Sequence, residues 1–224
     1  MGGGAQALSL HEGEKESITT RISATGEYAN LLGLGLAEND KNSVGPPKIV
    51  SVLGSVLEKT MKKNEKQRGG SSVSADVTVF HGSRAPSMSV GQYVDRIFRY
   101  SNCSPACFVV AYVYLDRFVA RTGAVLTSLN VHRLLITSIM LAAKFLDDGC
   151  YNNGYYAKVG GISNSELNKL EMKFLTALQF RLHVSVDTFI SYCALLEKPE
   201  RPVNPPRVRT SGFRKYLAKI LIVQ

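Results

Sequence analysis

The chain has 224 residues, a hydrophobic fraction of 45% and a formal net charge of +9. This length suits one domain with tails, or two small domains. No apolar run reaches the roughly 18 residues that a membrane-spanning helix needs, and no N-terminal apolar stretch is typical of a secretion signal. We therefore expect a protein of the nucleus or cytoplasm without membrane attachment. Without a secretion signal, its cysteines should be reduced. The spacing of Cys103, Cys107, Cys150 and Cys193 does not suit zinc, so we expect these side chains to be buried.

Much of the positive charge lies near the C-terminus. Between Lys198 and Lys219 there are seven basic residues against Glu200 alone. Charge in a tail says little about a folded domain, whereas a nucleic-acid-binding fold more often carries it on a structured face. We interpret 198–224 as a basic, proline-rich tail in which "FRKYLAKILIV" could form a short helix. Nucleic-acid binding through this tail is the alternative to the function argued below.

The N-terminal part of the chain divides into three segments. Residues 1–45 are rich in Gly, Ser and Thr without sustained periodicity, which favours disorder. Apolar residues then recur at helical spacing, and Pro46 and Pro47 are typical of a helix start. The pattern predicts an amphipathic helix over 46–67, set apart from the main domain, and a linker over 68–80. The lysines at its end leave open a membrane-surface or calmodulin-target role.

Five more helices are predicted between Ser89 and Leu196, so the main domain at 81–197 should be all-α. The boundary signals are caps and stops: Ser89; Ser104 with Pro105 and then Gly123; Asn130 and then Gly149; Ser163 with Glu166; and finally Pro199. No alternating strand pattern accompanies them. The stretch "CYNNGYYAKVGG" from Cys150 to Gly161 is predicted to be a long loop.

The third of these helices carries a polar stripe in an otherwise apolar sequence. Its members recur three or four residues apart: Arg133, Thr137, Leu141, Lys144 and Asp148. We expect this stripe to be the only face that does not pack within the domain. Met140 and Leu141 lie on or beside it. Apolar groups exposed beside a charge are typical of a partner surface.

The fourth helix places Glu171 in a stripe with Leu167, Phe174 and Leu178, which favour burial. A buried carboxylate without a partner is costly, so two opposite charges on neighbouring helices should pair. Spacing alone leaves other arrangements open. Lys144 could reach solvent or pair with Asp148 on its own helix, and Glu171 could face water.

Three motifs carry a family resemblance that covers about Val79 to Leu196. "YVYLDRF", "LAAK" and "LEMKFLTALQF" follow one another at the spacing of the cyclin box, and the chain most resembles the plant P-type, or U-type, cyclins. Those are similar to the yeast cyclin of phosphate-starvation signalling. The resemblance implies a single five-helix cyclin box preceded by an amphipathic helix. It also implies a regulatory subunit that activates a cyclin-dependent Ser/Thr kinase in cell division or phosphate and nutrient signalling.

The resemblance also implies a binding site. In the family, the lysine of the LAxK motif and a glutamate on the next helix contact the kinase around its regulatory helix, which corresponds to Lys144 and Glu171 here. Thr137, Met140, Leu141 and Asp148 complete the expected kinase-binding set. We expect no catalytic residue, cofactor, metal or small-molecule substrate, because the sequence lacks a glycine-rich phosphate loop and the kinase catalytic motifs.

The chain departs from the better-known cell-cycle cyclins at the start of the box. Val90 and Gly91 stand near the position of an arginine that opens the first helix in those proteins. Asp116 of "LDRF" therefore lacks its expected partner, and Arg96 and Arg117 are both candidates to replace it.

Overall fold

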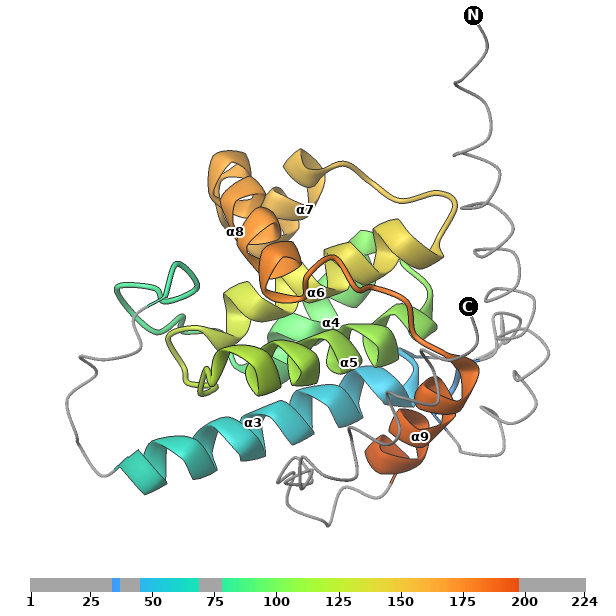
Figure 1. The fold of residues 1–224 in the computed structure, drawn as a ribbon, viewed down its shortest axis with the longest axis horizontal. Helices are drawn as coiled ribbons and strands as arrows, with labels where there is room; N and C mark the ends of the chain where they lie inside the picture. The colour runs from blue at the N-terminus through green and yellow to red at the C-terminus, as the bar shows by residue number, and fades with distance from the viewer. Residues whose placement is uncertain (1–33, 37–44, 69–77, 198–224) are drawn as a thin grey trace, which may run out of the picture.

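The computed structural model describes residues 34–36, 45–68 and 78–197, and this part of the chain is helical without strands (Figure 1). The helices are α3 (Lys48–Arg68), α4 (Val90–Ser101), α5 (Pro105–Thr122), α6 (Val131–Leu146), α7 (Asn153–Gly160), α8 (Asn164–Ala177) and α9 (Val186–Glu197). The predicted all-α class is confirmed. The proposed short helix in 198–224 lies outside the described residues, as does most of the N-terminal segment.

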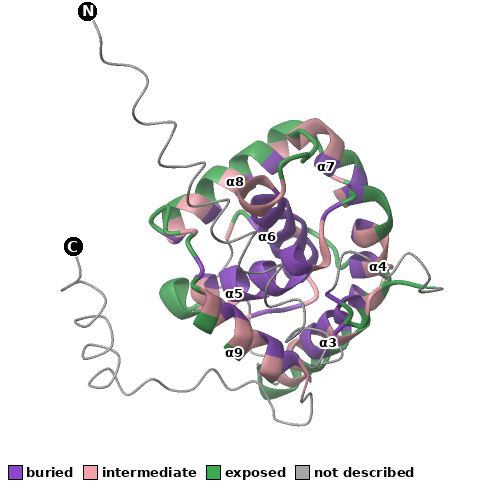
Figure 2. Cartoon of the chain, turned by 90° about the vertical axis from the view of Figure 1, so that its right-hand side faces the viewer, coloured by how far each residue is buried: buried purple, intermediate pink, exposed green. Residues whose placement is uncertain are grey.

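Helices α5 and α6 form the centre of the domain, and the other helices surround them (Figure 2). Both central helices are apolar on nearly every side, which is typical of helices enclosed by protein. Three aromatic rings join separate parts of this core. Phe118 of α5 stacks on Phe174 of α8 with ring centroids 4.8 Å apart, and Phe80 meets Phe118 edge to face at 5.1 Å. Phe80 lies in the predicted linker, yet it is buried.

The helix ends follow the predicted signals in part. Ser89 forms a reciprocal capping box with Gln92, and Gly123 ends α5 in the left-handed conformation that favours glycine. Ser104 and Asn130 stand at the predicted N-caps, but neither side chain caps its own helix. Helix α6 ends at Leu146, three residues before Gly149, because the backbone turns to an extended conformation at Asp147.

The predicted loop at 150–161 is wrong, because most of it is helix α7. Asn152 accepts a hydrogen bond from the backbone N–H of Tyr155 and caps the helix start. Gly161 ends the helix at a φ of +71°, where a side chain would be strained. The Asn and Gly residues therefore mark the two ends of a short helix. Residues 89–197 consequently hold one helix more than the five predicted.

Helix α3 belongs to the main body, so the expectation that it stands apart is wrong. It packs along α4 and also contacts α5 and α9 (Figure 1). The crossing with α4 is close, since a Cβ atom added to Gly54 would lie 2.7 Å from the Cα atom of Gly91. Leu34 and Leu36, inside the segment predicted to be disordered, are buried, and the carbonyl of Leu34 accepts a hydrogen bond from Ile49 at the start of α3.

The cysteines partly match the prediction. All four are free thiols, and three are buried, but Cys150 is exposed because it follows the end of α6. Among the described residues, no helix combines the length and the apolar character needed to cross a membrane.

Candidate partner-binding site

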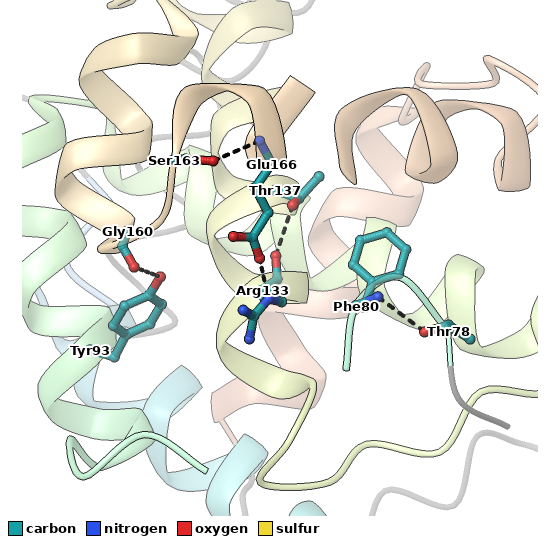
Figure 3. A network of polar contacts seen from close by, with 8 residues as sticks. All are labelled: Thr78, Phe80, Tyr93, Arg133, Thr137, Gly160, Ser163 and Glu166. Carbon is teal, nitrogen blue, oxygen red and sulfur yellow. Dashed lines mark hydrogen bonds and ion pairs between the residues drawn. The ribbon is translucent and has the colours of Figure 1, made fainter. Parts of the chain in front are cut away.

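Two ion pairs join α6 to α8. Arg133 donates from Nε to Oε1 of Glu166 over 2.6 Å, and Lys144 donates from Nζ to Oε1 of Glu171, also over 2.6 Å. Figure 3 shows the first pair, with Ser163 accepting the backbone N–H of Glu166 at the start of α8. The Glu166 carboxylate reaches Arg133, so only half of the predicted capping box forms here.

The predicted pairing of Lys144 with Glu171 is confirmed, and α7 adds a third member. Asn153, in the first turn of α7, donates from Nδ2 to Oε2 of Glu171 over 2.6 Å and to Oδ1 of Asn168 over 2.7 Å. Both carboxylate oxygens of Glu171 therefore have donors, one from α6 and one from α7. The site lies where α6, α7 and α8 meet, and the missed helix α7 is the reason that Asn153 was not predicted.

The pair is open to solvent on the lysine side. The side chain of Lys144 keeps 33% of its surface exposed, against 15% for Glu171. An ammonium group has three N–H donors, and the described residues take one of them. Glu171 thus holds the ammonium in a fixed position at the surface, where its remaining donors can meet acceptors on another molecule.

The expectation of an exposed stripe on α6 is wrong for its middle part. Thr137, Met140 and Leu141 are all buried. The Thr137 hydroxyl donates to the carbonyl of Arg133 one turn earlier over 2.8 Å (Figure 3), so this polar side chain needs no contact with solvent. Among the predicted set, Lys144 is half-buried and Asp148, beyond the end of α6, is exposed.

Exposed apolar side chains flank the pair in sequence. Met172 follows Glu171 and is 56% exposed, Tyr151 precedes α7 and is 42% exposed, and Phe180 follows α8 and is 62% exposed. Phe180 also has a φ of +57°, which is unusual for a bulky residue. A shallow depression of about 630 Å³ lies beside Met172 on the outer face of α8, with Val79 and Lys169 among its lining residues. Exposed apolar side chains of this kind are typical of binding surfaces.

Asp116 pairs with neither arginine that we considered. Its carboxylate accepts a hydrogen bond of 2.5 Å from the hydroxyl of Tyr192 on α9. Arg117 instead donates to the carbonyl of His183 over 2.9 Å, and Arg96 donates to the carbonyl of Val159 over 2.9 Å. The "LDRF" motif therefore anchors α9 and the segment before it to α5.

A domain of packed helices that holds a partly exposed lysine at the junction of α6, α7 and α8 is suited to binding a partner. In the described part of the chain, no group of three or more His, Cys, Asp or Glu side chains could hold a metal ion.

Comparison with known proteins identifies the family. The cyclin family model matches residues 48–182, which span α3 to α8 and end before α9. The chain is 47% identical to cyclin-P3-1 of Oryza sativa subsp. japonica over 183 residues, covering 81% of this chain and 78% of that protein. It is 50% identical to cyclin-U4-1 of Arabidopsis thaliana over 171 residues, covering 76% and 84% respectively. The chain belongs to the cyclin family, which supports a regulatory role.

Proposed function

We propose that this chain is the regulatory subunit of a cyclin-dependent Ser/Thr kinase and that it binds the kinase through Lys144 and Glu171. The observation that carries the proposal is the pair itself, a lysine at the rim of the domain whose position is fixed by a carboxylate that has a second donor. Membership of the cyclin family supports the class of partner.

The proposed contact uses the chemistry left free at the site. The remaining N–H donors of Lys144 would hydrogen-bond backbone carbonyls at one end of the regulatory helix of the kinase. Carbonyls at a helix C-terminus lack partners within the helix and carry partial negative charge, so an ammonium group is a suitable donor to them. The exposed side chains of Met172, Tyr151 and Phe180 would supply apolar contact area around this charge.

The proposed mechanism is a shift of population rather than catalysis by this chain. A protein kinase needs its strand lysine paired with a glutamate of the regulatory helix, and it is a poor catalyst when that helix is displaced. A rigid partner that binds the helix only in the competent position favours the active state by its difference in affinity for the two states. The ties between α6, α7 and α8 supply that rigidity.

The first test is retention of a kinase from a cell extract on the immobilised chain, followed by an assay of histone phosphorylation. The Lys144→Ala variant should lose the activity, because removing one partner of a desolvated charged contact costs about 2–5 kcal/mol of binding. That corresponds to a loss of affinity of at least about 30-fold. Circular dichroism should show that the variant keeps its helix content, since Lys144 is partly exposed.

The matched control is Lys62→Ala, which removes an exposed lysine from α3 on the opposite side of the domain (Figure 1). It should retain the kinase as well as the unchanged chain does. An equal loss with Lys62→Ala would place the kinase on α3 and contradict the proposed site. If no form retains a kinase, and DNA binding that weakens steeply with salt appears instead, the alternative function is supported.

We further propose action in the nucleus or cytoplasm, in cell division or in phosphate and nutrient signalling. Membership of the cyclin family supports the regulatory part of this proposal.

A further inference from the structure

A cavity of about 180 Å³ lies between α3 and α5, which run side by side (Figure 1). The described residues that line it come from these two helices and from the segment 124–126 that follows α5. On α3 the lining residues recur three or four positions apart, so one face of this helix turns toward the cavity: Leu57, Thr60, Asn64 and Gln67. None of the described lining residues belongs to the proposed kinase site on α6, α7 and α8.

The buried part of the lining consists of aliphatic and aromatic side chains. Its residues are Leu57, Tyr112, Leu115, Ala124 and Leu126. An engineered apolar cavity of about 150 Å³ in another protein binds benzene. The cavity between α3 and α5 therefore has room for one branched aliphatic or aromatic group, and moving such a group out of water is favourable.

The half-buried part of the lining carries two opposite charges, Lys63 on α3 and Asp116 on α5. Asp116 uses its Oδ2 to accept a hydrogen bond from the hydroxyl of Tyr192, and the described residues supply no donor to its Oδ1. Lys63 takes part in a further interaction, but an ammonium group has three N–H donors and can serve more than one acceptor. A carboxylate and a lysine therefore border one cavity whose interior is apolar.

We propose that this cavity binds a free apolar α-amino acid. The side chain of the ligand occupies the apolar interior, and its ammonium group donates a hydrogen bond to Oδ1 of Asp116. Its carboxylate accepts from the ammonium of Lys63. The side-chain amide of Gln67, at the exposed edge of the lining, is a second donor for that carboxylate.

Charge complementarity selects a zwitterion over ligands with a single charge. A simple amine would gain the attraction of Asp116 but would bring its positive charge toward Lys63. A simple carboxylic acid would gain the attraction of Lys63 but would bring its negative charge toward Asp116. An α-amino acid carries both charges beside one side chain, so each charge meets its opposite while the side chain leaves water.

The bound ligand would join three helices. Asp116 already ties α9 to α5 through Tyr192, and Lys63 belongs to α3, so a zwitterion held by both charges bridges α3 to the other two helices. Because this site exists only in the folded chain, the ligand should raise Tm as its concentration rises. The effect does not depend on a kinase, so a failure of the proposed function would leave it unaffected.

The test titrates the full ¹⁵N-labelled chain with L-leucine and with L-phenylalanine and follows the amide shifts by NMR. At least one of the two should give saturable shifts centred on the residues of α3 and α5 that line the cavity. Three compounds that each lack one feature are the controls: 3-methylbutylamine has no carboxylate, 4-methylpentanoate has no ammonium group, and glycine has no apolar side chain. Each should bind at least about fivefold more weakly, since one charged hydrogen bond or the apolar burial is lost.

Variants of the chain test the same contacts from the protein side. Asp116→Asn removes the charge but keeps an oxygen that can accept from Tyr192, and Lys63→Met keeps most of the side-chain stem. Each should weaken amino-acid binding at least about fivefold. The matched control is Lys59→Met, which removes an exposed lysine of α3 that is not among the lining residues and should leave binding unchanged. Circular dichroism should show that all three variants keep their helix content.

Three results would overturn the proposal. The first is the absence of saturable shifts with both amino acids in the folded, unchanged chain. The second is a 3-methylbutylamine or 4-methylpentanoate complex as tight as that of L-leucine, which would mean that the cavity does not recognise a zwitterion. The third is equal binding by Asp116→Asn, Lys63→Met and Lys59→Met, which would place the ligand elsewhere on the chain.

Discussion

The crossing of α3 and α4 gives two alanine substitutions with opposite expected effects. Gly54→Ala adds a methyl group whose carbon would lie 2.7 Å from the Cα atom of Gly91. The obstacle is backbone, so no side-chain rotation relieves it and the two helices must move apart. Gly91→Ala, the other half of the same crossing, adds a methyl group that meets nothing within 4 Å.

The magnitudes follow from two competing terms. Overpacking a close contact costs about 1–3 kcal/mol, while replacing glycine by alanine in a helix gains about 1 kcal/mol. Because the obstacle to Gly54→Ala is backbone, the upper part of the overpacking range, about 2–3 kcal/mol, applies, and the free energy of unfolding should fall by about 1–2 kcal/mol. Gly91→Ala keeps only the favourable term, and because it lies in the first turn of α4 the gain should be about 0.5 kcal/mol.

Urea unfolding followed by circular dichroism measures both free energies of unfolding. In a thermal scan, a loss of 1–2 kcal/mol should appear as a fall in Tm of about 2–8 °C for a domain of this size. If Gly54→Ala is as stable as the unchanged chain, α3 does not lie against α4 as described, and its inclusion in the domain would be refuted. A destabilised Gly91→Ala would refute the asymmetry of the crossing.

Three further predictions concern single side chains. Burial lowers the pKa of His132 from 6.5, so the unfolded chain gains a proton first as the pH falls. The free energy of unfolding should therefore decline below pH 6.5 until the folded pKa is passed, and His132→Gln should abolish that decline in urea titrations. Tyr192→Phe removes the donor to the Asp116 carboxylate and should cost about 1–2 kcal/mol of stability by the same method. Asn153→Ala leaves one oxygen of Glu171 without its donor and should weaken kinase binding about fivefold, or about 1 kcal/mol, in a titration; an unchanged affinity would contradict its positioning role.

The helices could be predicted where the apolar pattern ran over many residues and the capping residues lay outside it. Helix α5 is apolar over most of its length and is buried as predicted, whereas α6 is buried even along part of the stripe that was expected to be exposed. Helix α7 was missed because eight residues are too few to show a helical period, and its Asn and Gly caps were interpreted as turn residues.

The candidate site could be predicted in its charged pair but not in its surroundings. Lys144 and Glu171 stand out because each charge interrupts an apolar pattern. Thr137 also interrupts one, but its hydroxyl bonds to its own helix backbone, and a sequence does not distinguish this from an exposed polar residue. Asp116 finds Tyr192 on a helix 76 residues away in sequence, which only the packing of α9 on α5 determines.

We propose that the exposed ammonium of Lys144, held by Glu171, joins this cyclin to a cyclin-dependent kinase. The most direct measurement is the phosphorylation rate of a purified cyclin-dependent kinase, titrated with the unchanged chain and with Lys144→Ala. We expect the unchanged chain to raise the rate with one-to-one stoichiometry and the variant to need at least about 30-fold more protein for half the effect. Equal titration curves for the two chains would contradict it.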